Sequence, residues 1–568
     1  MHECLRLSAL QNLPISVRRA AQAAISGPTD RIAWIVATMM KPNNTSSMIY
    51  LLPLAYRLLD PTRIPSTDPD CAVLTPAEAD ATHTATYALD AVARTQTIPG
   101  DVAADIWSRV WLWHQFFEAH YRVHEEQLQE WRQCCRTVQA AHWLQHHTHM
   151  KPIIKSTPGF YSVVSRAWIA ALSVTGSPQN SAAPLFTPVA TFIADEDLIS
   201  TPQRLEDFVG DHGPSSIATL ALEHARHSLD LIEDVSQRRT GFHFLFNVVV
   251  FISIIQKASH GAHHMELPSR MVSQLARQDI LWVLVRAIDA AILKSTGSER
   301  KPIILQSLSS LKMLFNNEKL YAVRSTISAS LVGIVAACGR EPSLTETHDT
   351  LKTFLREHIP SCSIYWGDRA GSQVVSALDI NDSAVPEFSP ELRDAWTNFD
   401  ALARDRAAFS ESFDSTGVVR MKACDNTLCT TFGPMTVFKR CSGCATLFYC
   451  SVQCQAVDWN NGHRTACKLH IYLLRGRPST NPPTSRQRAF MRAILHRDYM
   501  HLKLKIYTEA VRTMHLSGDP NAGYFVMFDY MRGDAVVDVH SLALESEDLT
   551  WLCEMEGEWD EIEARAGT

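Results

Sequence analysis

The sequence predicts a mainly α-helical protein, with a multi-helix body, a small cysteine-rich module and a short β-hairpin. Three observations predict this fold class. Apolar residues recur at three- and four-residue steps nearly everywhere in residues 1–415. Seven of the fourteen cysteines fall within residues 424–467. The one clear β signal is two short apolar runs, 524–530 and 535–542, joined by a turn. We therefore expect a helical body at 1–415, the module at 424–467 and a C-terminal part at 468–568.

Composition and charge narrow the class of protein. The 568-residue chain is 46% hydrophobic and 20% charged, which is ordinary for a globular protein with a large core. Its start lacks the apolar run of a signal peptide, and its longest apolar run, Phe242–Ile255, is too short to span a bilayer and predicts a buried helix or strand. The net charge of −7 gives no general signal for nucleic acid. We expect a soluble intracellular protein, nuclear or cytoplasmic, without a membrane or nucleic-acid partner.

The helices of the body are predicted from apolar stripes and end signals. One stripe comprises Val102, Ile106, Val110, Trp113, Phe117 and Tyr121. From residue 279 three more helices follow one another, the last ending near Gly339. Ser343 with Glu346 predicts a capping box, and Ser389-Pro390 predicts another helix start. Residues 61–76 and 176–188, rich in Pro, Ser, Thr and Asn, are expected to be exposed connections. Stacked hairpins of an α-solenoid kind and one irregular helical domain both fit this pattern.

The cysteine-rich module has the ligand spacing of a zinc site. Its eight candidate ligands are Cys424, Cys429, Cys441, Cys444, Cys450, Cys454, His463 and Cys467. Zn²⁺ takes four thiolate or imidazole donors at about 2.0 to 2.3 Å, and closely spaced pairs can bind one ion together. Eight donors therefore make two sites. Disulfides would need an oxidising compartment, and a catalytic zinc would leave a position open for water, so we predict two structural Zn²⁺ ions.

The order of these ligands, with Phe448-Tyr449 before Cys450 and Trp459 before His463, resembles a MYND-type zinc finger. A departure is the four-residue gap between Cys424 and Cys429, where that family usually has two. The resemblance implies interleaved ligand pairs, although spacing alone does not fix the pairing. It would place Cys424, Cys429, Cys450 and Cys454 on one ion, and Cys441, Cys444, His463 and Cys467 on the other. A long helical body before such a finger resembles uncharacterised fungal MYND-finger proteins.

Two function classes follow from the resemblance. MYND fingers bind short, often proline-containing peptides of protein partners, with an aromatic residue at the position of Trp459 helping to form the groove. The alternative place for Trp459 is the core of the finger. The second class is the SET-type protein lysine methyltransferases that carry a MYND finger. Those enzymes have a Gly-x-Gly cofactor loop and an Asn-His pair, and neither occurs in this sequence. We therefore expect a zinc-binding interaction or adaptor protein without enzymatic activity.

Other histidines and cysteines carry weaker signals. Two groups of histidines, at positions 142–149 and 260–264, lack the nearby carboxylate or thiol that would complete a metal site, so we expect solvated side chains at helix ends. The adjacent Cys134 and Cys135 are expected to remain thiols, because neighbouring cysteines form a disulfide only in a strained geometry.

The C-terminal part combines opposite charges. Residues 464–505 contain ten Lys or Arg and one acid, and Thr484 with Gln487 predicts the start of a long basic helix that ends near Met514. A solvated face is the ordinary interpretation of such a helix. Residues 545–563 contain nine acids and no base, with Leu549, Leu552, Met555, Trp559 and Ile562 at helical spacing. We expect this acidic segment to dock on the helical body or on the basic helix, chiefly through apolar contacts.

Overall fold

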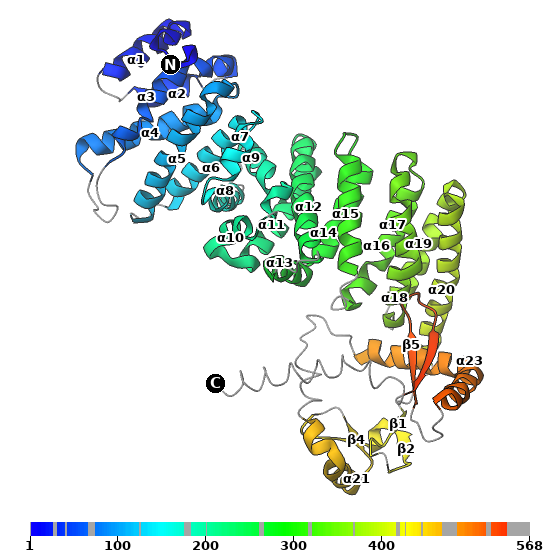
Figure 1. Ribbon diagram of the computed structural model, residues 1–568. Helices are drawn as coiled ribbons and strands as arrows, with labels where there is room; N and C mark the ends of the chain where they lie inside the picture. The colour runs from blue at the N-terminus through cyan, green and yellow to red at the C-terminus, as the bar shows by residue number, and fades with distance from the viewer. Residues whose placement is uncertain are drawn as a thin grey trace. The chain divides into compact units, whose positions relative to one another are not determined.

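The structure is a computed structural model, and it is almost entirely helical (Figure 1). It describes residues 2–26, 31–39, 42–65, 74–123, 127–174, 183–199, 201–260, 266–315, 321–366, 370–415, 421–426, 428–444, 447–467, 485–517 and 524–541. Packing divides the chain into two compact units, Met1–Ser310 and Leu311–Thr568. Residues 1–415 thus extend over both units, and the acidic segment 545–563 lies outside the described residues.

The first unit is built from helices that pack mainly on helices close to them in sequence, such as α5 on α6 and α11 on α12. Its helices are α1 (Ile15–Ser26), α2 (Ile32–Met39), α3 (Leu52–Leu58), α4 (Pro76–Arg94), α5 (Gly100–Val123), α6 (Gln127–Leu144), α7 (Met150–Lys155), α8 (Phe160–Val174), α9 (Ala183–Ile193), α10 (Pro202–Val209), α11 (Gly213–Glu233), α12 (Arg238–His260), α13 (Glu266–Arg277), α14 (Ile280–Lys294) and α15 (Arg300–Phe315), which crosses into the second unit.

The core of the first unit confirms the predicted apolar stripes. All six residues of the stripe from Val102 to Tyr121 lie on α5 and are buried. The apolar run Phe242–Ile255 falls inside α12. By length and composition the span Arg238–Ser259 of α12 is long enough to cross a membrane, but 72% of its apolar window is buried in the fold, as in the core helices of globular proteins.

The second unit begins with helices and ends with a β-hairpin. Its helices outside the cysteine-rich module are α16 (Tyr321–Gly339), α17 (His348–Thr353), α18 (Ile359–Cys362), α19 (Ala370–Asn381), α20 (Pro390–Ser415) and α23 (Ser485–Ser517). The hairpin pairs β5 (Tyr524–Asp529) with β6 (Val536–Ser541) in antiparallel register, with Val526 opposite Val539. It packs on α23. The predicted hairpin and the long basic helix are therefore present.

A buried arginine anchors the hairpin turn within this unit. Arg406 of α20 is 1% exposed and donates from Nη2 to the carbonyl oxygen of Gly533 in the turn, at 2.7 Å. The same nitrogen lies 3.6 Å from the Asp498 carboxylate of α23. Gly533 has φ of +84°, and a Cβ added there would contact Leu402 and lie 2.8 Å from Cβ of Pro360. Glycine is thus required by both conformation and space, and α20, α23 and the hairpin meet at this point.

Three local predictions need correction. Ser343 and Glu346 lie in a 3₁₀ segment, Pro342–Thr347, without the expected capping box; Ser343 donates to Glu341 instead. The expected connection 176–188 becomes helical at Ala183, and Pro188 lies inside α9. His142 is buried rather than solvated, and its Nδ1 lies 3.1 Å from the Thr191 hydroxyl. For His142 this contact with α9 is a tertiary one, which helical periodicity does not predict.

Candidate metal centre

The cysteine-rich module is a small scaffold of paired strands and one helix. Strand β1 (Met421–Ala423) pairs with β2 (Phe432–Pro434), and β3 (Lys439–Arg440) pairs with β4 (Phe448–Tyr449), both antiparallel. Helix α21 (Val452–Asp458) continues into a π-helical turn, Trp459–His463. The ligand pairs lie at the ends of these elements, where the backbone turns. Two-residue and three-residue strands cannot be stable alone in water, so the module needs a further source of stability.

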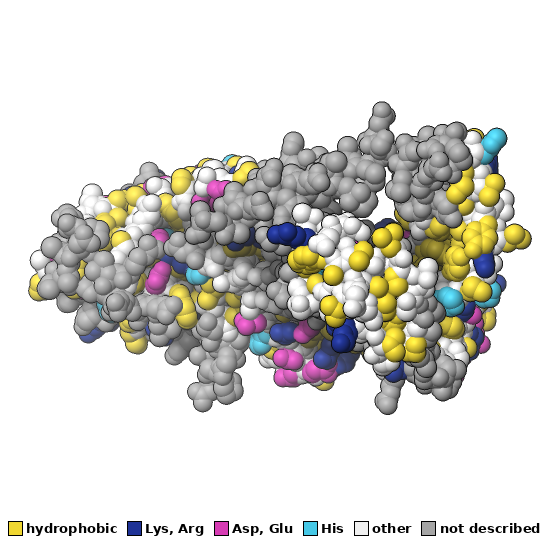
Figure 2. Space-filling view, turned by 90° about the horizontal axis from the view of Figure 1, so that it is seen from below, with side chains coloured by type: hydrophobic (Ala, Val, Ile, Leu, Met, Phe, Trp, Pro, Cys, Tyr) yellow, Lys and Arg dark blue, Asp and Glu magenta, His cyan; other side chains and the backbone are white. Residues whose placement is uncertain are grey.

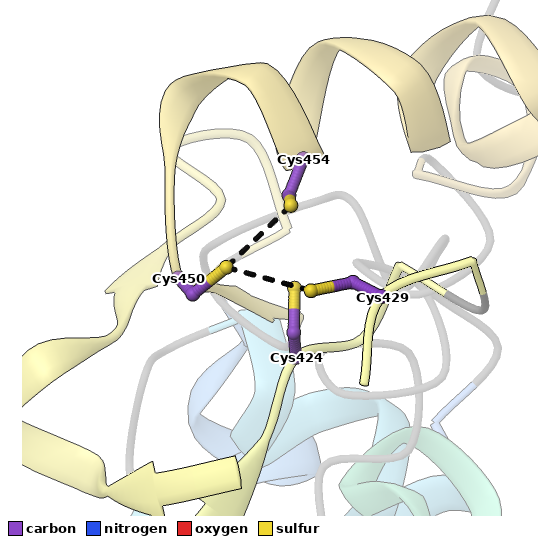
Figure 3. Close-up of side chains that lie close together, drawn as sticks. All are labelled: Cys424, Cys429, Cys450 and Cys454. Atoms are coloured by element: carbon purple, nitrogen blue, oxygen red, sulfur yellow. Dashed lines mark hydrogen bonds between the residues drawn. The ribbon is translucent and has the colours of Figure 1, made fainter. Parts of the chain in front are cut away.

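The first group of ligands brings together four thiols from three places in the chain. Cys424 and Cys429 flank the turn after β1, Cys450 follows β4, and Cys454 lies on α21 (Figure 3). Their four sulfur atoms all lie within 4.8 Å of one another. Cys450 Sγ is 3.6 Å from Cys429 Sγ and 3.5 Å from Cys454 Sγ. Four sulfurs at about 2.3 Å from one tetrahedral zinc are about 3.8 Å apart, so this arrangement suits a Cys4 zinc site.

The second group combines three thiols with an imidazole. Cys441, Cys444, His463 and Cys467 are all buried, and their donor atoms also lie within 4.8 Å of one another. His463 Nε2 lies 3.3 Å from Cys441 Sγ and 3.7 Å from Cys444 Sγ, so this nitrogen faces the thiols. Cys441 Sγ and Cys467 Sγ are 4.0 Å apart. The donor set is Cys3His, and the two groups are those that the interleaved pairing implied.

The unusually long first ligand spacing is accommodated by a side-chain turn. Asn426 is 5% exposed, and its Oδ1 accepts from the backbone nitrogen of Leu428 at 3.1 Å. The Asn426 carbonyl accepts from the Cys429 nitrogen at 2.8 Å. Asparagine is well suited to closing such turns on its own backbone. Asn426 therefore helps to bring Cys429 back beside Cys424, a role that sequence spacing alone did not predict for Asn426.

The π-helical turn positions the histidine ligand. Gly462 has φ of +129°, a backbone conformation that residues other than glycine rarely adopt. The turn brings His463 into the second ligand group, and the Trp459 ring lies 5.5 Å from the His463 ring in an edge-on contact. The Tyr449 hydroxyl donates to Asp458 at 2.6 Å and ties β4 to α21. The sequence shows Gly462 directly before the ligand His463, but the spacing of the ligands alone does not predict this turn.

The ligand thiols differ in their pKa, which is lowered for Cys429, whereas burial raises the pKa of Cys467 to about 11. The Thr431 hydroxyl lies 3.2 Å from Cys429 Sγ, and this hydrogen bond holds the pKa of that thiol below its ordinary value, at about 6. The thiolate is the form that binds zinc. Two zinc ions with seven thiolates and a neutral imidazole sum to about −3. Among the cations of the finger, Lys422 and Arg440 lie over the Phe448 ring at 4.8 and 5.0 Å from its centroid, and Lys422 also pairs with Asp425 at 3.3 Å.

The outer surface of the module is apolar in places, and Figure 2 shows hydrophobic side chains on its outward face. The exposed apolar residues of the module are Leu428 (75%), Val437 (56%), Val452 (67%), Val457 (41%) and Trp459 (37%). On α21 and the turn that continues it, Val452 and Trp459 are seven residues apart and share a face. Such residues are free to contact another molecule.

The other candidate residues do not form a metal site within the described part of the chain. Among the described residues, the two ligand groups above are the His, Cys, Asp and Glu clusters close enough to hold an ion. His147 and His149 instead lie within hydrogen-bonding distance of the backbone oxygens of Ile98 and Gly100. Of the second histidine group, His260 ends α12, and His263 and His264 lie outside the described residues. Cys134 and Cys135 are buried free thiols, and burial raises the pKa of each.

Comparison with known proteins identifies the module. Residues 424–467 match the family model described as MYND finger. The matched segment begins at Cys424 and ends at Cys467, the first and last of the eight donors. No curated protein and no solved structure matches the chain. The likeness to known proteins therefore rests on the finger.

Proposed function

Residues 424–467 are a MYND finger with two zinc sites, and from this premise we propose that the chain is a non-catalytic adaptor that binds a short peptide segment of a protein partner. One observation carries the proposal: the donor sets of both ions are complete, while apolar side chains of the finger face outward. Closed zinc sites stabilise a module without performing chemistry. Exposed apolar residues grouped on a small module mark a contact surface.

The face of α21 that carries Val452 and Trp459 is the proposed peptide-binding face. Trp459 is 37% exposed and also contacts the ring of the ligand His463, so one side of the indole supports the zinc site and the other is open to a partner. Aromatic residues provide large contact areas at low entropic cost. A role in the groove requires that Trp459→Ala keep both zinc ions and lose the partner. A role in the core alone requires that it lose zinc.

A proximity-labelling comparison in cells tests the adaptor function. Val452→Asp places a charge on the proposed face, and Val457→Asp places the same charge about 140° around α21 and serves as the matched control. Both variants keep every zinc donor. We expect Val452→Asp to lose the partners labelled by the wild type and Val457→Asp to retain them. Unchanged labelling with Val452→Asp, while zinc content stays intact, would rule out this face.

The proposal also excludes methyl transfer and places the protein inside the cell. The chain lacks the Gly-x-Gly and Asn-His elements of the SET-type methyltransferases that carry MYND fingers. Calorimetric titration with S-adenosylmethionine should therefore show no binding, and a saturable isotherm would overturn the assignment. Thiolate ligands persist in a reducing compartment, so we place the protein in the nucleus or cytoplasm. Fractionation of cells that express the tagged chain tests that location.

A further inference from the structure

The long helix α23 has two apolar faces, and its own neighbours cover one of them. Ile506 and Ala510 are 2% and 3% exposed, and α23 packs on the hairpin and on α20. The second face runs along the same half of the helix. It consists of Met500 (53% exposed), Leu504 (80%), Tyr507 (46%) and Val511 (66%). The steps of four, three and four residues place these side chains in one stripe about 17 Å long.

A stripe of this kind is costly to leave in water. Burial of a large apolar side chain is favourable, and exposed apolar residues in a continuous row mark a surface that binds something. Cations border the stripe. Lys503 and Lys505 are exposed on the same half of α23, and Lys503 Nζ lies 5.6 Å from the centroid of the Tyr507 ring. Arg512 is exposed there too and pairs with Glu509 at 3.8 Å. The occupant should therefore be apolar along one side and acidic along its edges.

We propose that residues 545–563 of the same chain cover this stripe. Five large apolar residues of the segment, from Leu549 to Ile562, recur at steps of three, three, four and three. As a helix these span about 20 Å, close to the length of the stripe on α23. The nine acids of the segment, with no base among them, complement the cations along α23. A second copy of α23 would instead bring cations against cations.

The chain is long enough for this contact within one molecule. The Thr513 hydroxyl of α23 donates to the backbone oxygen of Val539, so β6 lies beside the C-terminal part of the helix. Leu549 follows the last residue of β6, Ser541, by eight positions, which allows a reach of up to about 26 Å. The acidic segment can therefore reach Val511 without spanning the rest of the unit. Apolar contacts provide the stability and charges select the orientation, because exposed ion pairs contribute little to stability.

Hydroxyl-radical footprinting with mass spectrometry tests this directly, because methionine sulfur oxidises according to its exposure. In the full chain Met500 should oxidise severalfold more slowly than in a chain truncated after Leu544. Met527 of β5 is 45% exposed, lies off the stripe and is the internal reference whose rate should stay the same. Far-ultraviolet dichroism of the truncated chain checks that its helices remain folded.

A point variant keeps the test valid if truncation disturbs the fold. Leu504→Asp should remove the protection of Met500 in the full chain. Leu293→Asp, at a 78% exposed position of the first unit, is the matched control and should leave that protection unchanged. Equal Met500 oxidation in the full and truncated chains would overturn the proposal. Protection that appears only at high protein concentration, together with a dimeric mass, would also overturn it and assign the stripe to a second copy.

Discussion

The finger and the helical units are stabilised by different means. Six buried residues form the core of the finger, and four of them, Cys424, Cys441, Cys444 and Cys467, are zinc ligands. The helical units instead bury large side chains such as Trp113, Trp168 and Trp366 completely. Apolar burial is the main favourable term in the folding of such units, whereas a small module without enough core depends on its metal. The comparison leads us to expect that the chain can lose the fold of the finger and keep that of the helical units.

Removal of one zinc ligand should therefore have the largest effect on stability. This effect should be confined to the finger. Cys444→Ser takes a donor from the Cys3His site, and structural zinc in such modules contributes on the order of 10 kcal/mol. We expect amide protection to disappear across the finger while the far-ultraviolet dichroism of the helices changes little. Hydrogen exchange followed by mass spectrometry measures both regions in one sample. Unfolding of the helices together with the finger would show that the two regions are not independent.

Gly533→Ala should destabilise the second unit without affecting zinc. The added methyl group would contact Leu402 and Pro360 at a residue with φ of +84°, and would displace the carbonyl that accepts from Arg406. Steric overlap and a weakened buried hydrogen bond together are expected to cost about 2 to 4 kcal/mol. Denaturant unfolding gives the loss, and zinc content should stay at the wild-type level. Ala535→Gly, at the other end of the turn, is the control.

Acid should weaken the first unit through its buried histidines. His224 accepts from the Trp168 indole nitrogen at 2.8 Å, and burial lowers its pKa to about 3. His114 is also buried and has its pKa lowered to about 3. Because the unfolded imidazole titrates near 6.5, the unfolded state binds protons first, and stability present above pH 6.5 is lost as the pH falls toward 3.

Each such histidine contributes a slope of up to about 1.4 kcal/mol per pH unit over that window. His224→Gln keeps an acceptor for Trp168 and removes the titration, so its stability should depend less steeply on pH than that of the wild type. Urea unfolding of the chain at several pH values from 6.5 downward measures the slope. An identical slope in the variant would contradict the burial of a neutral His224.

Removal of an equivalent helix cap from each region should have the smallest effects on stability. The two effects should also be of different kinds. Thr75 caps α4 in a capping box with Glu78, and Ser451 caps α21 by accepting from the Cys454 nitrogen at 3.1 Å. Loss of either cap should cost about 1 kcal/mol. Thr75→Ala should appear as a lower melting temperature, whereas Ser451→Ala should appear as weaker zinc binding in competition with a chelator. A lower melting temperature of the helical units in Ser451→Ala would contradict the independent stability of the finger and the helical units.

Much of this structure could be predicted from the sequence, because local patterns determine it. The stripe on α5 follows from helical periodicity, and the eight donors follow from the spacing of Cys and His. The remaining features depend on contacts that spacing does not encode. Asn426 closes the long ligand turn through its own side chain, and Gly533 is needed because Arg406 and Pro360 lie against it. Burial of His142 and the continuation of α9 through Pro188 likewise depend on neighbouring helices.

The measurement that most directly tests the central claim is the zinc content of the purified chain by plasma mass spectrometry. Two complete donor sets predict two zinc ions per chain. Cys429→Ser and Cys444→Ser alter different sites, so each single variant should lose the ion of its own site first, and the double variant should lose both. The structure accounts for two ions in the wild type. One ion, or none, would contradict the account of the finger as a module held by two structural zinc sites.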